Sequence, residues 1–564
     1  MKCQPSPLKE VFKVNQPKPI PRKYDELMRN IENGIYQIPK FQRDFIWEKE
    51  RVAKLLDSII KGYPIGTFIL WKTRDRLRSV KKIGSEIFKE LPEGDFVYYI
   101  LDGQQRITSL YLAVKGIILN DGGNYKEISV DLEEAKKWIK YPEYDGEIVT
   151  IEKPEHNLFV TFYELVNERT SKLARKFGSL VDRDYIEDLI DDLKDMIRGY
   201  EFSTIEIENQ PLGRVTEIFT RINTAGKTLT LFEIMNAKVY QERNGKVIFD
   251  LEEKFNELIN DLEGANYETI ADNRTIILQL ISLILKQNAK RDAILSLPKG
   301  DFIDIWDNAV RALKLAIDKV RTYFRIPVSK LLPYYVLLVP VAYFYYINNF
   351  KEPSPEQAKD LERYFFRSAF TNRFSSAVES KLNNDIKIME KIKFKQKIDW
   401  SNELPVNFDK ELLIEWLKEP FTTSNAFDKG VLCILAYFQP KRFNDNGLVI
   451  LDNSWLSRSN SKNYHHFFPK AYLKKIGKVD FANALANITF VDDYLNKREI
   501  KAKPPSRYIL AEFAKMNPYI DETLKSHLID DINDFGVSND DYDAFLEKRC
   551  EKIVNEILTR IGGI

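Results

Sequence analysis

Two adjacent histidines begin the part of the sequence with the most chemical content, residues 464–498. The chain has four histidines, and this pair is followed by two phenylalanines, a proline and, later, two asparagines. The residues of interest are, in order, His465, His466, Pro469, Asn487 and Asn496. Cleavage of a phosphodiester needs a base that activates water, a divalent cation near the leaving oxygen and a rigid frame. A neutral imidazole suits the first task, so the stretch predicts a nuclease site.

A hairpin followed by a helix is expected to position these residues. His465–Phe468 is expected to form a strand that ends at Pro469, with Ala486–Val491 as its partner, because β-branched and aromatic residues are prominent in both. Asp493–Arg498 is expected to begin a helix that presents Asn496 to the space beneath the hairpin. The alternative is that the two histidines are ordinary strand residues, one buried and the other exposed.

This order and spacing resemble the HNH, or His-Me finger, nucleases. Their pattern is a metal ligand, a histidine, two apolar residues and a proline, then an asparagine on the second strand and another on the helix. The resemblance implies that His466 is the general base and that Asn487 orients it. It also implies that His465 and Asn496 are metal ligands. Many members carry Asp or Glu where this chain has His465, and a neutral imidazole is a softer ligand than magnesium prefers. The expected cation is therefore Mg²⁺ or Mn²⁺, with a transition metal left open.

Basic residues are close in sequence to the proposed site. Those expected to bind DNA are Lys470, Lys474, Lys475, Lys497 and Arg498. Their position beside the histidines favours a local patch for phosphate groups, and the alternative is a solvated charged face.

A second stretch with chemical content, Phe96–Gly116, combines a strand, a glycine turn and a helix. Phe96–Leu101 is an apolar run typical of a strand. Asp102 and Gly103 are expected to make the turn, and Gln104–Lys115 has helical periodicity. The start of such a helix offers backbone N–H groups and a favourable dipole to an anion, so a phosphate would bind well there.

The side chains at this turn add to the phosphate hypothesis. Asp102 supplies a carboxylate that could hold a metal or position water, and Gln104 and Gln105 supply neutral amides. Arg106 brings a positive charge to the first turn of the helix. For these five residues alone, a tight turn with a capping aspartate and a solvent-facing arginine is the favoured interpretation.

Four separated blocks extend the argument beyond this turn: IPKFQRDFIW (residues 38–47), LDSIIKGYPIG (56–66), ILDGQQRITSL (100–110) and EIFTRINTAGKTLTLFEIMNAKV (217–239). In this order they resemble the N-terminal domain of GmrSD-type modification-dependent restriction enzymes, which is related to the ParB and sulfiredoxin fold. In that family the domain is associated with NTP binding and hydrolysis. The resemblance implies a nucleotide site with Asp102 and Arg106 in catalytic roles. Its residues would be Gln42, Arg43, Asp102, Gly103, Gln104, Gln105 and Arg106.

Composition restricts the class of protein. With 44% hydrophobic and 30% charged residues the chain is an ordinary soluble globular protein, and its 564 residues suggest about three domains. The 85 Lys and Arg residues are balanced by 84 Asp and Glu residues, so any contact with DNA must be local. Three cysteines far apart in sequence suggest neither a disulfide framework nor a structural zinc site, which fits a reducing cytoplasm.

Neither a secretory signal nor a membrane span is expected. The N-terminus has no apolar segment of the kind that signal peptides carry. The longest apolar run, Leu331–Ile347, is short for a membrane span and contains Pro333 and Pro340. It is expected to be a buried, kinked helix.

These patterns predict a multidomain α+β protein. Residues 1–22, rich in proline and lysine, are expected to be an extended arm, and residues 23–245 a ParB/sulfiredoxin-like NTP-binding domain. Helical periodicity dominates residues 246–400, the expected scaffold region. Residues 401–564 are expected to be a mostly helical HNH nuclease domain that carries the ββα-metal motif.

The leading hypothesis is an NTP-regulated, metal-dependent DNA endonuclease that restricts modified foreign DNA. Its partners would be modified double-stranded DNA and a nucleotide, and assembly into a homo-oligomer is left open. A second hypothesis is a nucleotide-regulated DNA-binding protein with an inactive HNH module, which the unusual His465 favours. A third is a sensor of a backbone modification such as phosphorothioate.

Overall fold

The computed structural model divides the chain into two compact units, Met1–Ile248 and Phe249–Ile564, called here the first and the second unit. It describes residues 18–42, 45–84, 86–119, 122–141, 143–177, 181–222, 229–243, 246–456, 464–492 and 499–563. Four of the expected site residues and one expected helix lie outside the described residues. They are Arg43, Asn496, Lys497 and Arg498, and the helix over Asp493–Arg498.

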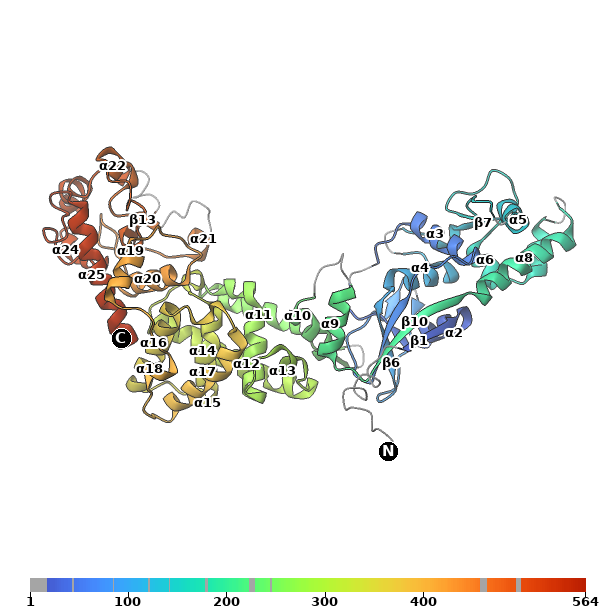
Figure 1. Cartoon of the computed structure of the whole chain (residues 1–564), viewed down its shortest axis with the longest axis horizontal. Coiled ribbons are helices and arrows are strands. Elements are labelled where there is room, and N and C mark those ends of the chain that lie inside the picture. Colours follow the sequence, from blue (N-terminus) through green and yellow to red (C-terminus); the bar gives the residue numbers. More distant parts are fainter. Residues whose placement is uncertain are drawn as a thin grey trace, which may run out of the picture. The chain divides into compact units, whose positions relative to one another are not determined.

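A five-stranded mixed sheet forms the centre of the first unit. In spatial order its strands are β1 (Lys18–Lys23), β10 (Glu201–Glu208), β3 (Phe68–Thr73), β6 (Val97–Asp102) and β2 (Tyr36–Gln37). β1 with β10 and β3 with β6 run antiparallel, whereas β10 with β3 and β6 with β2 run parallel. Figure 1 shows β1, β6 and β10 in one layer, with α4 (Gln104–Lys115) beyond the end of the strands. Together with the largely helical second unit, this sheet confirms the α+β fold class.

The end of the expected N-terminal arm belongs to this sheet. Lys18–Lys23 forms the edge strand β1, in which Pro19 pairs with Ile205 and Pro21 with Ser203. Proline has no N–H to donate, so it fits a strand only where that N–H would face away from a neighbouring strand. The two prolines alternate, and the strand can therefore bond β10 on one side while its outer edge resists pairing with another chain.

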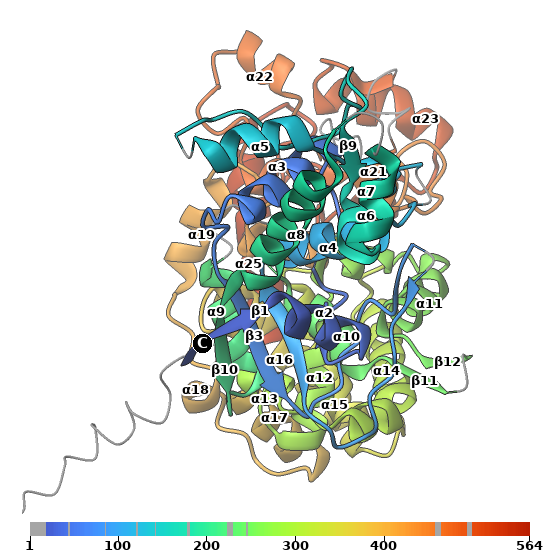
Figure 2. The same ribbon diagram turned by 90° about the vertical axis from the view of Figure 1, so that its right-hand side faces the viewer.

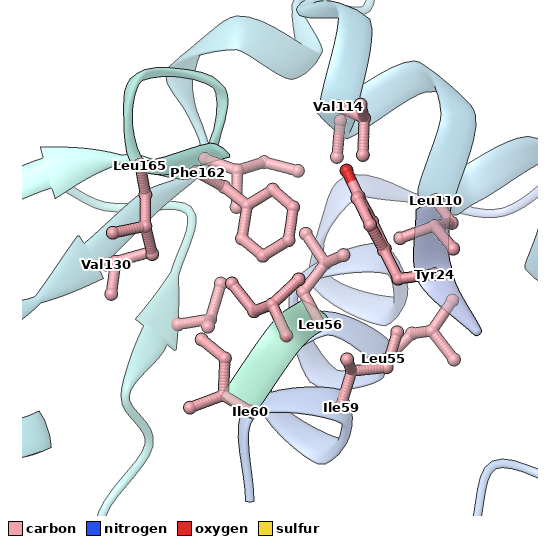
Figure 3. Packing of buried hydrophobic residues seen from close by; sticks show 14 of the residues in the cluster. Tyr24, Leu55, Leu56, Ile59, Ile60, Leu110, Val114, Val130, Phe162 and Leu165 are labelled. Atoms are coloured by element: carbon pink, nitrogen blue, oxygen red, sulfur yellow. The ribbon is translucent and has the colours of Figure 1, made fainter. Parts of the chain in front are cut away.

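Helix α3 (Lys49–Ile60) packs at the centre of the hydrophobic core of the first unit. Its buried apolar residues recur at helical spacing: Val52, Ala53, Leu55, Leu56, Ile59 and Ile60. Figure 3 shows Leu55, Leu56, Ile59 and Ile60 packed against side chains from other elements of the unit. These partners include Tyr24, Leu110, Val114, Val130, Phe162 and Leu165. The core thereby fixes α4, the helix that begins at the glycine turn, against α3.

The other elements of the first unit surround this core. Its remaining strands are β4 (Lys82–Ile83), β5 (Glu86–Ile87), the three-stranded sheet β8 (Val149–Thr150), β7 (Ser129–Asp131) and β9 (Phe159–Thr161), and the pair β11 (Gln241–Arg243) and β12 (Lys246–Phe249). Its remaining helices are α2 (Tyr24–Glu32), α5 (Leu132–Lys140), α6 (Phe162–Asn167), α7 (Thr170–Ala174), α8 (Arg183–Gly199), α9 (Leu212–Ile222) and α10 (Leu231–Val239).

Helices make up most of the second unit. They are α11 (Leu251–Glu263), α12 (Thr275–Lys286), α13 (Arg291–Leu295), α14 (Lys299–Thr322), α15 (Leu338–Ile347), α16 (Pro355–Phe370), α17 (Val378–Lys393), α18 (Trp400–Glu403), α19 (Lys410–Lys418), α20 (Ala426–Tyr437), α21 (Asn453–Leu456), α22 (Lys470–Lys475), α23 (Ala514–Met516), α24 (Ile520–Ser526) and α25 (Tyr542–Ile561). A π-helical segment spans Ser506–Phe513. The described residues of this unit also form the strands β13 (Tyr464–His466) and β14 (Ile488–Phe490).

The long apolar run Leu331–Ile347 is largely buried, as expected, but it is not one kinked helix, because short 3-10 turns precede the helix α15. α15 contacts α12, α14 and α17, which lie together in Figure 2. The helix begins only at Leu338, and Pro340 lies in its first turn, where a missing N–H removes no helical hydrogen bond. Among the described helices, none is both long and apolar enough to span a membrane.

A buried arginine connects the middle of the chain to its C-terminal part. Arg367 of α16 is 3% exposed, and burial lowers the pKa of its guanidinium. It donates hydrogen bonds to the carbonyl oxygens of Trp400, Leu404 and Ile561, at 2.9–3.2 Å. Residues on both sides of position 400 therefore pack within one unit, and the division expected there stays a prediction.

Candidate functional site

The two histidines lie on the expected hairpin. β13 pairs antiparallel with β14, so that His465 is opposite Thr489 and His466 is opposite Ile488. Both strands are shorter than expected, but the ladder continues for one more residue because the Phe467 N–H donates to the Asn487 carbonyl at 2.8 Å. Figure 1 places β13 in the same part of the second unit as α22 and α25.

Asn487 fixes the backbone next to the histidines. Its side chain is fully buried, its Oδ1 accepts from the Phe468 N–H at 2.9 Å, and its Nδ2 donates to the Phe468 carbonyl at 3.0 Å. A further bond reaches the Ala482 carbonyl at 3.2 Å. Asn487 thus holds the chain two residues after His466. The imidazole itself has a different partner.

That partner is Asn483, in the loop between the strands. His466 Nε2 lies 2.9 Å from Asn483 Oδ1, and Asn483 Nδ2 donates to the Phe421 carbonyl at 3.3 Å. The second contact fixes which end of the amide faces the histidine. Because Oδ1 can only accept, Nε2 must carry the proton, and Nδ1 is left as the basic nitrogen. Nothing in the sequence singles out Asn483.

The surroundings of His466 favour its neutral form. Burial lowers the pKa of His466 to about 4, the hydrogen bond with Asn483 opposes this shift, and the charge of Lys470 adds to it. An imidazole with this pKa is uncharged at neutral pH, so the lone pair of Nδ1 is available, but it is a weaker base than a histidine with the ordinary pKa near 6.5. The geometry and the protonation state of His466 therefore suit a general base.

His465 lies on the opposite, core side of the same strand, because adjacent strand residues point to opposite faces. It is 3% exposed, and its ring lies edge-on to that of Tyr508, with 6.2 Å between the ring centroids. Its expected partner as a metal ligand, Asn496, lies outside the described residues. Within the described ranges, no group of three or more His, Cys, Asp or Glu side chains could hold a metal ion. The metal site stays a prediction.

Three of the five expected DNA-binding residues are described, and all three lie on α22 directly after Pro469. Lys470, Lys474 and Lys475 are exposed, and none of them forms an ion pair in the part of the chain that the structure describes. Lys478, just beyond the helix, is instead paired with Asp543 of α25. The free lysines and the half-buried His466 thus belong to one short segment.

Two residues that the sequence did not single out support the hairpin from the core side. Arg549 of α25 is fully buried and donates to the Ile488 carbonyl at 3.3 Å, and burial lowers the pKa of its guanidinium to about 9. His527 bonds the Thr489 hydroxyl through Nδ1 and donates from Nε2 to the Lys441 carbonyl at 2.7 Å. All three contacts join residues far apart in sequence.

The protonation of His527 should make the stability of the second unit depend on pH. Burial lowers the pKa of His527 to about 3, whereas an unfolded histidine titrates near 6.5. Between these values the unfolded chain binds one more proton, so the free energy of unfolding should fall as the pH falls, by at most about 1.4 kcal/mol per pH unit. Denaturant unfolding of the second unit at several pH values measures this slope. His527→Gln should reduce it, and the control His156→Gln, in the first unit, should not.

The turn at residues 102–106 has the expected layout. β6 ends at Asp102, Gly103 is the N-cap residue, and α4 begins at Gln104 and runs to Lys115. Gly103 has a φ of 92°, and a Cβ there would lie 2.2 Å from Cδ1 of Phe68, so only glycine fits. The predicted strand, glycine turn and helix are confirmed.

The tight-turn alternative implies that Arg106 faces solvent, but in the structure its guanidinium is bonded to the protein. Its Nη1 donates to the Ile65 carbonyl at 2.7 Å, and its Nη2 donates to the Thr67 carbonyl and to Asp102 Oδ2, both at 3.0 Å. The guanidinium also lies over the Phe68 ring, 5.1 Å from its centroid. Arg106 therefore ties the loop before β3 to the glycine turn, which brings the second and third sequence blocks together.

The first sequence block, residues 38–47, contacts the same turn through hydrogen bonds of two glutamine side chains. Gln42 Nε2 donates to the Ile100 carbonyl at 2.5 Å, and Gln105 Oε1 accepts from the Ile46 N–H at 2.9 Å. Gln105 is 7% exposed. Three blocks that are separate in sequence thus surround the start of α4. The nucleotide role of Gln42, Asp102 and their neighbours stays a prediction.

Residues 24–240 match the family model described as the GmrSD restriction endonuclease, N-terminal domain. This part of the chain is therefore similar to a GmrSD-type N-terminal domain. It runs from the first residue of α2 to the residue after α10 and includes all four sequence blocks. An uncharacterized protein of Methanocaldococcus jannaschii, MJ0686, is 23% identical over 616 residues, which cover 95% of this chain and 98% of that protein. That similarity therefore extends over both units.

Proposed function

We propose that the chain is a modification-dependent DNA endonuclease in which a GmrSD-type N-terminal domain regulates a nuclease site in the second unit. The match of residues 24–240 to a domain of a restriction endonuclease carries this proposal. It supplies the class of activity, restriction of DNA, to a chain whose second unit holds a neutral histidine next to exposed lysines.

In the proposed nuclease site, His466 is the general base and accepts a proton from water on Nδ1. Asn483 holds the tautomer through Nε2, and Asn487 fixes the backbone that carries the imidazole. A divalent cation, Mg²⁺ or Mn²⁺, held by His465 and Asn496 would stabilise charge on the leaving oxygen. Lys470, Lys474 and Lys475 would neutralise phosphates of double-stranded DNA.

In the proposed regulatory domain, the start of α4 binds the phosphates of an NTP. α4 has twelve residues, and its N-cap, Gly103, has no side chain that would cover the first turn. Gln42, Arg43 and Gln105 would surround the nucleotide. Asp102 would position water or a metal ion for hydrolysis, and Arg106 would act with it.

A DNA-binding protein with an inactive HNH module is the second candidate. The burial of His465 favours it, since a ligand on the core side of the strand has to reach a cation there. The two candidates differ in whether the purified chain cuts DNA at all.

A plasmid-cleavage assay tests the proposal. Modified and unmodified plasmids are incubated with the full chain and Mg²⁺ or Mn²⁺, with each NTP and without nucleotide. We expect cutting of the modified plasmid, at a rate that changes with the nucleotide. Tight DNA binding without cutting under every condition would instead establish the second candidate.

The lysines of α22 should determine how DNA affinity depends on salt. Each phosphate contact adds about 0.9 to the slope of the logarithm of the binding constant against the logarithm of salt concentration. We expect the double change Lys474→Ala and Lys475→Ala to reduce that slope by about 2. The matched control is Lys351→Ala with Lys387→Ala, two exposed lysines elsewhere in the second unit. An equal loss of slope in the control would place the DNA away from α22.

A further inference from the structure

The loop between α22 and β14 exposes three apolar side chains to solvent. Ile476, Val479 and Phe481 are 43%, 57% and 49% exposed, although β14 directly after this loop is buried. We call these three residues the apolar tip. We propose that the apolar tip is a wedge for duplex DNA, and that Phe481 inserts between neighbouring base pairs beside the phosphodiester that the proposed nuclease site cleaves. This inference rests on the proposed nuclease function and specifies how that site holds its DNA.

Hydrogen bonds fix the backbone of the apolar tip. The exposure of its three side chains is therefore a property of the folded loop. The Phe481 carbonyl accepts hydrogen bonds from the Tyr542 hydroxyl of α25 and from the Ala484 N–H. The Ala482 N–H donates to the Val479 carbonyl at 3.1 Å, which closes a turn within the tip. A wedge that is already held in place loses little conformational entropy when it binds.

The tip and the proposed base belong to one segment. Phe481 is two residues from Asn483, whose Oδ1 lies 2.9 Å from His466 Nε2. Two residues of extended chain span at most about 7 Å. The Asn483 backbone is fixed in turn, because its carbonyl accepts from the Phe421 N–H at 2.8 Å. DNA that contacts Phe481 therefore has its backbone within reach of His466.

The charges beside the tip match DNA better than they match an apolar protein surface. Lys474 and Lys475 are exposed, directly precede Ile476, and form no ion pair within the described ranges. A groove of duplex DNA presents phosphates at its rims and stacked bases inside. Proteins that bend DNA use this combination, with basic residues on the backbone and an apolar wedge that unstacks one base step.

The experiment measures DNA bending and affinity with the full chain in EDTA, so that the probe is not cut. The probe is a short duplex with a donor and an acceptor dye at its two ends. We expect the wild-type chain to raise energy transfer. Phe481→Ala should abolish that rise and weaken binding by about tenfold, in the range of a lost aromatic contact with a base, while it leaves the salt slope unchanged. Phe394→Ala, which removes another exposed phenylalanine of the second unit, is the control and should behave as wild type.

The outcomes separate this inference from the proposed function. Unchanged bending and affinity in Phe481→Ala overturn the wedge, whether or not the chain cuts DNA. If DNA bending depends on Phe481 but the chain does not cut DNA, the wedge is supported and only the nuclease proposal is wrong. Sedimentation gives the remaining outcome: if Phe481→Ala turns an oligomer into a monomer, the tip docks a second copy of the chain and the wedge is wrong.

Discussion

His466→Ala should lower the rate of DNA cleavage by about 10²–10⁴-fold, the usual contribution of a general base. The variant should still bind DNA, because the lysines of α22 are unchanged. It should also hydrolyse NTP normally, because the proposed nucleotide site lies in the first unit. Single-turnover cutting of a modified plasmid, at saturating protein, measures the effect without interference from binding.

Folding should not obscure this result. The His466 side chain is half-buried, and within the described ranges its one hydrogen bond is to Asn483, so its removal should cost about 1 kcal/mol of unfolding free energy. His156→Ala is the matched control, since His156 is a partly exposed histidine of the first unit that also bonds a side chain, that of Asp131. Cutting by His466→Ala within a few-fold of wild type would remove the base assignment.

Asn483 offers an independent test of the same site. If it holds the tautomer of His466, Asn483→Leu should reduce cleavage, whereas Asn483→Asp, which keeps an accepting oxygen, should retain more of it. An equal loss in the two variants would mean that Asn483 acts through the loop and not through the imidazole.

Local signals were enough to predict the elements that carry these residues. The strand, glycine turn and helix over residues 97–115 are confirmed because an apolar run, a glycine required at φ of 92° and helical periodicity follow one another directly. The hairpin of His466 was predictable for a similar reason. Pro469 marks the end of the first strand, and apolar residues identify the second.

Contacts between residues that are distant in sequence could not be predicted from such local patterns. Asn483 touches His466 only because the loop between the strands is anchored at Phe421, 62 residues before it. The prolines of Lys18–Lys23 suggested an arm, but an edge position in the sheet accommodates them. In both cases the deciding partner lies far away in the sequence, and no local pattern reports it.

Arg106 shows how the structure changes the interpretation of an experiment. Arg106→Ala should abolish NTP hydrolysis if this turn is the nucleotide site. The same change also leaves the carbonyls of Ile65 and Thr67 without their donor, which should cost about 2–3 kcal/mol of stability in the first unit. A loss of hydrolysis in this variant alone therefore does not separate chemistry from folding.

The variant Asp102→Asn separates an effect on the chemistry of NTP hydrolysis from an effect on folding. Asp102 is about one-third exposed, and asparagine keeps its size and an oxygen that can accept from Arg106. We expect this variant to fold as stably as wild type, checked by denaturant unfolding, and to lose NTP hydrolysis because the carboxylate charge is gone. Normal hydrolysis in Asp102→Asn would remove the catalytic role from this carboxylate, and normal hydrolysis in Arg106→Ala as well would remove the nucleotide site from the turn.

The coupling between the two units is then measured in one preparation of Asp102→Asn. If the nucleotide state controls the nuclease, the protein has two states with different affinities for NTP, and a defect in hydrolysis must change the rate of DNA cleavage. Modified DNA should in return change the hydrolysis rate of the wild-type chain, although rates need not show the strict reciprocity of binding energies. The sign is open, because NTP could activate the nuclease or its hydrolysis could release an inhibited form. Lost hydrolysis together with wild-type cleavage under every nucleotide condition would mean that the chain carries two independent activities.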